Sequence, residues 1–409
     1  MSFDRRALEA QGYLVVPGFI DLHAHLREPG FEDSETIATG AKAALRGGFT
    51  TVCAMPNTEP AIDSPGLVAE VIARGRSAGA ARVLPIAAIT RGRNGRELAD
   101  LVELAAAGAI AFSDDGSPVE DARLFRSALE YARVTGRPVI EHPQDQTLSA
   151  KGVMHEGAVS ARLGLPGIPA AAEETAVARD IAIAKMTGGR LHLTHLSTAG
   201  SIELVRRAKA DSAPITCDVT PHHLAMTDDW VAGSRAFAWE VPDEALQGVP
   251  YDSSTKVNPP LRSHADVRAL WAGLADGTVD AIATDHAPHA SVKKDVEFDQ
   301  AAFGISGLET ALALVLGGVR AHWAPLESVI DALTIGPARV LGIEPGDDDW
   351  VAIDRDAEWL VSADELVSKG KNTPILGRTV IGRIVHVSMA GETKLGGRRE
   401  GNAEALVRR

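Results

Sequence analysis

The 409-residue sequence contains only two cysteines, Cys53 and Cys217, and no apolar run long enough to span a bilayer. Both cysteines lie in apolar, strand-like segments, so we expect buried thiols in a reducing compartment and neither a disulfide nor a zinc–thiolate site. The N-terminal segment lacks the long apolar region of a signal peptide. These features predict a cytoplasmic protein.

Positive charge is also scarce, because 41 lysines and arginines stand against 55 aspartates and glutamates, for a net charge of −14. Acidic residues are spread along the chain, so we expect neither nucleic acid nor an anionic membrane as a partner. An anionic small-molecule substrate would have to be held by local cations. Hydrophobic residues make up 45% of the chain, enough for a large core.

Apolar, strand-like runs alternate with segments of helical periodicity, such as SETIATGAKAALRGG and SIELVRRAKA, and a loop-rich stretch covers residues 227–263. The eight predicted strands are YLVVPGFIDLH, FTTVCAM, ARVLPIAAI, AIAFSDD, RPVIEH, RLHLTHL, PITCDVTPH and DAIATDH. This α/β pattern predicts a parallel (β/α)8 TIM-like barrel, although an open doubly wound sheet would give a similar alternation.

The pattern changes near residue 344. The segments DWVAIDRDAEWLVS and RTVIGRIVHVSMAGETK alternate like strands and have no helical segment between them. We therefore predict a barrel over residues 13–343 and a small β-rich domain formed by residues 1–12 and 344–409.

Two histidines end the first predicted strand, in the segment VVPGFIDLHAHLREPG of residues 15–30. Residues i and i+2 of a strand face the same side, so His23 and His25 project together and could form half of a metal site. If the strand continued, Arg27 would point the same way. Two polar residues at a solvated strand end are the alternative reading of this pair.

Polar residues also end other predicted strands, and in a barrel the carboxyl ends of all strands face one mouth. Each residue alone reads as an ordinary polar side chain, but four histidines and two aspartates together could hold two divalent metals about 3.5–4 Å apart. These residues are His23, His25, Asp114 or Asp115, His142, His195 and Asp285.

Strand alternation narrows the candidates. Asp114 and Asp115 face opposite sides of a regular strand, and at most one of His192 and His195 faces the barrel. The other histidines are expected to have structural roles or none: His155, His222, His223, His264 and His322.

The segments PGFIDLHAHLREPG, GGFTTVCAMPNT, FSDDG, HLST, TPHHL, NPPLR and ATDHAPH resemble, in this order, the motifs of class I dihydroorotases in the amidohydrolase superfamily. The HxH pattern alone marks the superfamily, whereas HLREPG with NPPLR and DHAPH is much more specific. The resemblance runs from about residue 15 into NTPILGRTVIGRIVHV, nearly the whole chain.

The resemblance implies two zinc ions per chain, bridged by Asp115, with Asp285 both binding metal and acting as the catalytic proton shuttle. The zinc-binding histidines it implies are His23 and His25 for one ion and His142 and His195 for the other. It also implies a set of substrate-binding residues: Arg27, Asn57, Asn258, His289, Phe303 and Gly304.

The implied activity is the reversible cyclisation of N-carbamoyl-L-aspartate to L-dihydroorotate in de novo pyrimidine biosynthesis, by a zinc-bound hydroxide with an aspartate proton shuttle. One alternative is another cyclic amidase, of the allantoinase or dihydropyrimidinase type. Those substrates lack the carboxylate that Arg27 would grip in bidentate fashion. Another is a non-catalytic dihydroorotase-like partner of aspartate transcarbamoylase, although all six ligands are present. We expect a homo-oligomer and leave a complex with aspartate transcarbamoylase open.

Two segments depart from the family pattern. About a dozen residues precede the first barrel strand, where relatives have some forty, so we expect an incomplete or differently built small domain. The fifth strand ends in EHPQD where relatives have HCED. His142 is kept, so we expect altered packing there without loss of the metal.

Overall fold

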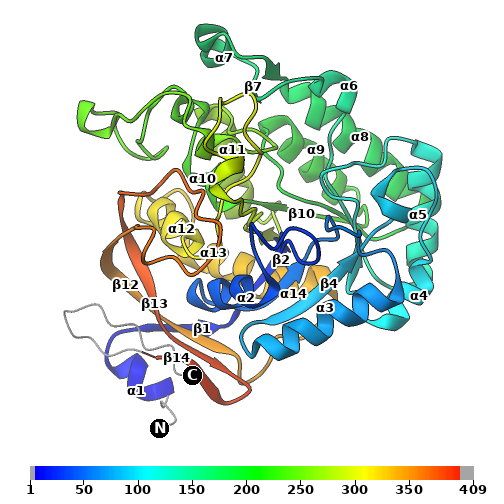
Figure 1. Ribbon diagram of the computed structural model, residues 1–409, viewed down its shortest axis with the longest axis horizontal. Coiled ribbons are helices and arrows are strands. Elements are labelled where there is room, and N and C mark those ends of the chain that lie inside the picture. Colours follow the sequence, from blue (N-terminus) through cyan, green and yellow to red (C-terminus); the bar gives the residue numbers. More distant parts are fainter. Residues whose placement is uncertain (1–4, 397–409) are drawn as a thin grey trace.

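In the computed structural model, which describes residues 5–396, eight parallel strands occupy the centre of the molecule (Figure 1). A parallel bridge joins Ala24 to His286, and the His25 amide donates to the His286 carbonyl at 2.8 Å, so the first strand lies beside the segment after the last. The ring is therefore nearly closed, which confirms the TIM-like barrel. The strands, in neighbour order, are β11 (Ala281–Ile282), β10 (Ile215–Val219), β9 (Leu191–Leu193), β6 (Val139–Glu141), β5 (Ala111–Phe112), β4 (Arg82–Ala87), β3 (Phe49–Ala54) and β2 (Phe19–Ala24).

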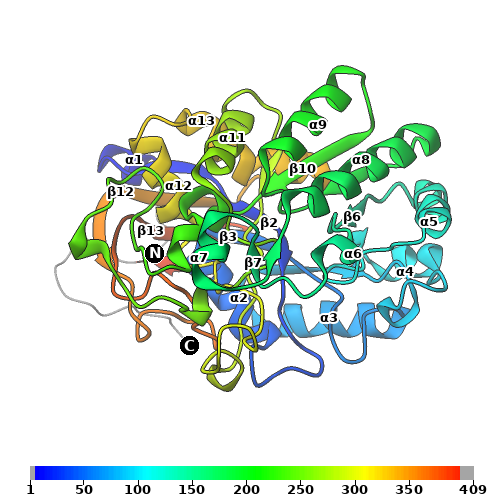
Figure 2. The same ribbon diagram turned by 90° about the horizontal axis from the view of Figure 1, so that it is seen from above.

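Helices cover the outside of this barrel (Figures 1 and 2). The first of them, α2 (Ile37–Arg46), begins where the Thr36 hydroxyl accepts a bond from the Thr39 amide, and it buries Ile37 and Leu45. The other long helices are α3 (Pro65–Ala78), α4 (Leu101–Ala107), α5 (Ala122–Thr135), α8 (Ala170–Thr187), α9 (Ala199–Ala210), α11 (His264–Ala275), α12 (Ala311–Arg320), α13 (Leu326–Leu333) and α14 (Ile335–Leu341).

Short elements lie in the loops of the barrel. The predicted loop-rich stretch of residues 227–263 contains three isolated 3-10 turns and neither an α-helix nor a named strand, which confirms its irregular character. These short elements are α6 (Gln146–Ser149), β7 (Met154–His155), α7 (Ala158–Leu163), β8 (Gly167–Ile168), α10 (Pro221–Ala225), η1 (Arg91–Arg93), η2 (Asp228–Trp230), η3 (Glu244–Leu246), η4 (Ser253–Thr255) and η5 (Ser291–Lys293).

Along each strand, one side chain points into the barrel and the next points outward to pack against the helices. The buried cluster that contains Leu22, Cys53, Ile86 and Ile140 is separate from the larger cluster formed with the helices. Cys53 and Cys217 are both buried free thiols, as the sequence predicts. The alternation of apolar residues thus produces two cores, one on each side of the strands.

A second, antiparallel sheet is built from β1 (Leu14–Pro17), β12 (Trp350–Leu360), β13 (Thr379–Met389) and β14 (Glu392–Gly396). Leu8 of α1 (Arg5–Ala10) is buried with Tyr13 and Ala352 at this sheet. No helix separates β12 from β13, as the sequence predicts. Residues 1–4 and 397–409 of the predicted small domain lie outside the described residues.

The prediction of a single first strand, YLVVPGFIDLH, is wrong, because the segment forms β1 and β2 in different sheets. The chain passes between them at Gly18, where an added Cβ would lie 2.4 Å from side-chain atoms of Thr50. A period of two residues gives the facing of each side chain but does not indicate the sheet to which the strand belongs.

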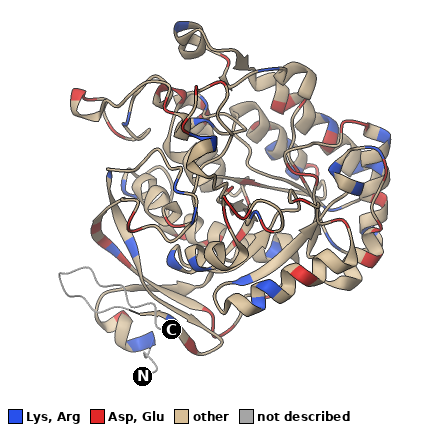
Figure 3. Ribbon diagram, viewed as in Figure 1, with Lys and Arg blue, Asp and Glu red and all other residues tan. Residues whose placement is uncertain are grey.

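Charged residues of both signs are interspersed over the outer helices (Figure 3). Some form pairs one helical turn apart, such as Arg74 with Glu70 at 2.7 Å and Arg126 with Glu130 at 2.9 Å. Within the described residues, every helix is too short or too polar to cross a membrane.

The contact at Gly18 generates a stability prediction. Gly18→Ala should lower the free energy of unfolding by about 1–3 kcal/mol because the new methyl group overlaps Thr50. Thr50→Ala in the same chain should recover part of this loss. Gly66→Ala in α3, where an added Cβ meets nothing within 4 Å, is the control. Urea denaturation that finds Gly18→Ala and Gly66→Ala equally stable would contradict this account.

Candidate metal centre

All six predicted metal ligands are buried at the carboxyl ends of barrel strands. His23 lies in β2 and His25 immediately follows it, while His142 immediately follows β6. The other three come two or three residues after the strands β5, β9 and β11: Asp115, His195 and Asp285. Because parallel strands end on the same side of the barrel, residues distant in the sequence meet at one mouth.

The carboxylate of Asp115 lies among all four histidines. Its Oδ2 is 3.3 Å from His23 Nε2 and 3.6 Å from His25 Nε2. Its Oδ1 is 3.3 Å from His195 Nε2 and 3.4 Å from His142 Nδ1. One carboxylate oxygen therefore faces each histidine pair, the arrangement required of a bridging ligand.

The carboxylate of Asp285 approaches only the first histidine pair. Its Oδ1 lies 3.0 Å from His25 Nε2 and 3.5 Å from His23 Nε2. Two groups have ligand atoms within 4.8 Å of one another and could each hold a metal ion: His23, His25 and Asp285, and His23, Asp115 and His195.

The two buried carboxylates make the site favourable for a bound cation. Burial disfavours the charged form of Asp115, but His23, His142 and His195 hold the pKa of its carboxyl well below 3.8. The pKa of Asp285 is likewise lowered, by His25 and His23, against the effect of burial. Burial alone would lower the pKa of His23, yet Asp115 and Asp285 raise it to about 10. Both carboxylates are therefore ionised at neutral pH.

Hydrogen bonds on the far side of the rings orient these histidines. His23 Nδ1 lies 2.9 Å from Thr194 Oγ1, and His25 Nδ1 lies 2.8 Å from Asn57 Oδ1. With its Nδ1–H donating to that amide oxygen, neutral His25 would have the Nε2 lone pair available for a cation beside Asp285. Imidazole with carboxylate suits zinc, cobalt or manganese. The residues present therefore fit a divalent metal.

Asp114 lies outside this cluster. Its Oδ1 accepts bonds from the backbone amides of Ile89 at 2.9 Å and Thr90 at 3.1 Å. Asp114 therefore joins neighbouring strand ends, and only Asp115 of this pair faces the histidines, in agreement with the predicted alternation.

His192 also faces away from the cluster, and its Nε2 lies 2.7 Å from Asp218 Oδ2. His223 has structural bonds, with Nε2 2.9 Å from the Pro259 carbonyl and Nδ1 2.8 Å from Thr220 Oγ1. Their placement agrees with the expected structural roles.

Arg27 lies beside the barrel mouth, but its backbone conformation is not the extended one that was expected. Its φ of 61° shows that the chain no longer runs as a strand, so the expected extension beyond His25 is wrong. Its Nε nevertheless donates to the Pro288 carbonyl at 3.1 Å, and its Nη2 is 3.3 Å from His289 Nε2. The neighbouring Glu28 pairs with Arg74 and not with Arg27.

His289 lies beside Phe303 and Gly304, two other residues of the predicted substrate site. His289 Nε2 is 2.8 Å from the Phe303 carbonyl, and the Gly304 amide donates to the Lys256 carbonyl at 2.9 Å. Gly304 has a φ of 137°, and an added Cβ would lie 2.6 Å from that of Ala287, so a larger residue does not fit.

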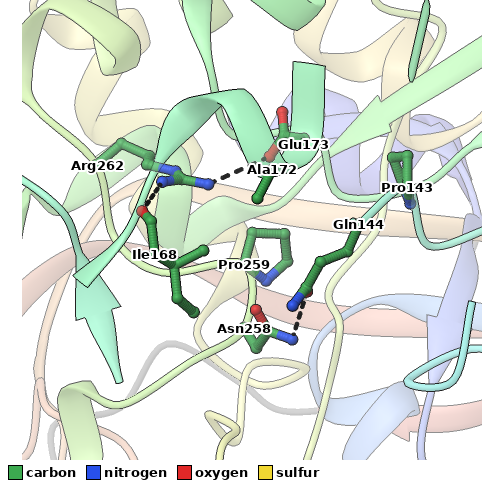
Figure 4. A pocket seen from close by; sticks show the side chains of 8 residues that line it. All are labelled: Pro143, Gln144, Ile168, Ala172, Glu173, Asn258, Pro259 and Arg262. Atoms are coloured by element: carbon green, nitrogen blue, oxygen red, sulfur yellow. Dashed lines mark hydrogen bonds and ion pairs between the residues drawn. The ribbon is translucent and has the colours of Figure 1, made fainter. Parts of the chain in front are cut away.

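One predicted substrate-binding asparagine contacts a predicted metal-ligand histidine directly, and the other is connected to one through a glutamine. Asn57 bonds to His25, and Asn258 Nδ2 donates to Gln144 Oε1 at 2.8 Å. Gln144 Oε1 is also 2.7 Å from His142 Nε2. Figure 4 shows Asn258 directed at Gln144 in a pocket that lies beside the ligand cluster and contains none of its members. The pocket is lined by Pro143, Gln144, Ile168, Ala172, Glu173, Asn258, Pro259 and Arg262.

Three residues that the sequence analysis did not single out support the ligands. Gln144 and Thr194 bond to the outer nitrogens of His142 and His23. The guanidinium of Arg93 donates to the Asp115 carbonyl. The departure EHPQD did mark the position of Gln144, whereas nothing local to Thr194 or Arg93 indicated a role.

The barrel and its six strand-end ligands place the chain among amidohydrolase-type barrel proteins. The family model described as dihydro-orotase-like matches residues 12–201. A dihydroorotase of Anaeromyxobacter sp. (strain K) is 52% identical, with 95% of this chain and 88% of the relative covered. One of Pelotomaculum thermopropionicum is 53% identical, with 92% and 85% covered. The chain belongs to the dihydroorotase family.

Solved structures support the fold. An L-hydantoinase (dihydropyrimidinase) from Arthrobacter aurescens superposes with a TM-score of 0.80 at 22% identity, covering 97% of this chain and 88% of the other. A dihydropyrimidinase from Brevibacillus agri gives 0.75 at 20% identity, covering 94% and 85%. At this identity the likeness concerns the barrel and its second sheet.

The two neighbouring aspartates generate a prediction about metal content. Asp115→Ala should lose most of the bound metal, because this carboxylate faces both histidine pairs. Asp114→Ala should keep more metal, but its free energy of unfolding should fall by about 1–3 kcal/mol because buried amides lose their hydrogen-bond acceptor. Plasma mass spectrometry and thermal unfolding distinguish the two variants. Greater metal loss in Asp114→Ala would show that the assignment is reversed.

Proposed function

We propose that this chain is a dihydroorotase, a metal-dependent cyclic amide hydrolase that interconverts N-carbamoyl-L-aspartate and L-dihydroorotate. The observation that carries the proposal is the guanidinium of Arg27, held against His289 beside the ligand cluster. The 52% identity of this chain to a dihydroorotase, over 95% of its own length, supports the same substrate.

We further propose two zinc ions per chain, one held by His23 and His25 and the other by His142 and His195. Asp115 would bridge them, and Asp285 would contact the first. Metal ions bound there would activate water and polarise the amide carbonyl.

Asp285 is the proposed proton shuttle. Its pKa lies below 3.8, so at neutral pH the carboxylate is ionised and can take a proton from the attacking water. It then delivers the proton to the leaving ring nitrogen. Ring closure uses the same group in the opposite order, so one side chain serves both directions.

The substrate would be held by groups around Arg27. A guanidinium pairs well with a carboxylate. Arg27 would therefore supply the local cation that a chain of net charge −14 needs to hold an anionic substrate. Burial and the charge of Arg27 lower the pKa of His289 to about 3, so its imidazole is neutral. His289 Nδ1 and Asn258 Oδ1 are buried without a hydrogen-bond partner among the described residues. Both are suited to bind polar atoms of the ring.

The hydantoinase or dihydropyrimidinase type is the second candidate, because the compared solved structures carry those names. Arg27 argues against it, since a neutral cyclic amide gives this cation no partner. A non-catalytic partner protein is opposed by the convergence of all six ligands. A homo-oligomer and a complex with aspartate transcarbamoylase stay predictions of the sequence.

Arg27→Met tests the substrate. The variant should keep its metal but lose about 2–5 kcal/mol of carboxylate binding, which is on the order of a 30- to 5,000-fold loss in kcat/KM for dihydroorotate. Arg74→Met, at a partly exposed arginine paired with Glu28 and Glu70, is the control and should stay within a few-fold of the parent. Equal kinetics for both variants would remove the main physical support for this substrate.

Asp285→Asn tests the proton shuttle. Asparagine keeps the size and one ligating oxygen but removes the base, so turnover should fall by about 100-fold or more in both directions. Metal content should fall less than in His195→Ala. Asp33→Asn, at a carboxylate that pairs with Lys293, is the control. Near-normal turnover of Asp285→Asn would assign the shuttle to another group, with His289 the next candidate.

A further inference from the structure

The connection between β12 and β13, residues 361–378, reaches the barrel from the small sheet. Its residues 368–372, here called the mouth segment, contact loops at the barrel mouth. Ser368 Oγ donates to Glu35 Oε2 at 2.6 Å, and Ser306 Oγ donates to the Gly370 carbonyl at 2.7 Å. The segment therefore joins the small sheet to the loops that carry the proposed substrate groups.

Asn372, at the end of the mouth segment, hydrogen-bonds to these loops through both ends of its side-chain amide. Its Oδ1 accepts from the His289 amide at 2.8 Å and lies 3.0 Å from Ser306 Oγ, whose single proton it shares with the Gly370 carbonyl. Its Nδ2 donates to the carbonyls of Gly304 at 2.9 Å and Ala287 at 3.1 Å. Asn372 is 6% exposed, so lost bonds would not be replaced freely by water.

These bonds connect two separate substrate loops. Residues 286–290 carry His289, and residues 303–306 carry Phe303 and Gly304. The backbone adds a further link, because the Ser306 amide donates to the Asn372 carbonyl at 3.1 Å. Asn372 thus reinforces the direct bonds between these loops, in which the Ala287 amide donates to the Ile305 carbonyl at 2.9 Å and His289 Nε2 lies 2.8 Å from the Phe303 carbonyl.

The close approach of the backbone at Gly370 strengthens this link. A Cβ at Gly370 would lie 2.6 Å from the His289 nitrogen and 2.9 Å from its carbonyl oxygen. The mouth segment therefore contacts the His289 backbone directly, and the position has no room for a side chain.

We propose that Asn372 is a positioning residue for substrate, through which the small sheet completes the substrate site of the barrel. The inference rests on the proposed function, which gives His289 and Gly304 their roles. The hydrogen bonds described for Asn372 do not include any of the six predicted metal ligands. Loss of its side chain should consequently disturb substrate binding and leave the metal in place.

Kinetics with a matched control test this role. Asn372→Ala should raise KM for dihydroorotate and for N-carbamoyl-L-aspartate about ten-fold, with a smaller fall in kcat and unchanged metal content. Trp359→Phe removes a bond of 3.0 Å from the indole to the Gly382 carbonyl within the small sheet. It should lower Tm while leaving KM unchanged. If Asn372→Ala does not fold, Ser306→Ala, which removes the hydroxyl shared between the Gly370 carbonyl and Asn372 Oδ1, should raise KM two- to five-fold.

Hydrogen exchange separates the inference from the proposed function. In Asn372→Ala, residues 286–290 and 303–306 should exchange faster than in the parent, and in Trp359→Phe they should not. An active parent whose Asn372→Ala variant keeps KM within two-fold would overturn the inference alone, since the residue would then be only structural. A parent that binds metal but does not act on dihydroorotate would overturn the proposed function, and unchanged exchange would overturn the positioning role independently of activity.

Discussion

The burial of one carboxylate among four imidazoles is the constraint on which this molecule depends. Asp115 lies 3.3–3.6 Å from His23, His25, His142 and His195. A buried charge is costly unless it is paired, so all four rings must be correctly placed at once. They come from three strand ends, and Asp115 itself comes from a fourth. The barrel must therefore close in one register, and the metal centre and the fold share the same requirement.

A second set of buried carboxylates maintains that register. Asp21 accepts from the Thr284 amide at 2.8 Å, which joins the first barrel strand to the last. Asp114 accepts from the Thr90 amide, and Asp218 accepts from the His195 amide at 2.6 Å. Burial raises the pKa of Asp21 and of Asp114 to about 6. Carboxylates thus recur at strand ends for two reasons, because some face the cation site and others join neighbouring strands.

Sequence periodicity predicted what lies within a strand and failed where strands end. It predicted that Asp114 and Asp115 point to opposite sides and that His192 and His195 do not both face the barrel, and the structure agrees, although His195 has a φ of 41° and lies beyond the regular strand. It extended the first strand to Arg27, whose φ of 61° shows that strand alternation no longer applies there. It also missed the change of sheet at Gly18. The contacts of Asn372 join residues more than 65 positions apart, so no local pattern could have predicted them.

The barrel and the proposed substrate site depend on different parts of the chain. A shared barrel is compatible with different ring substrates, because specificity lies in the loops at its mouth. In this chain the loops carrying Arg27, His289 and Gly304 are bonded to one another, and the last two are bonded to Asn372. The predicted ligand cluster depends on strand register, whereas the proposed substrate groups His289 and Gly304 are also bonded to a segment that connects two strands of the second sheet. A change in that segment would therefore act on the proposed substrate groups before it acts on the predicted metal ligands.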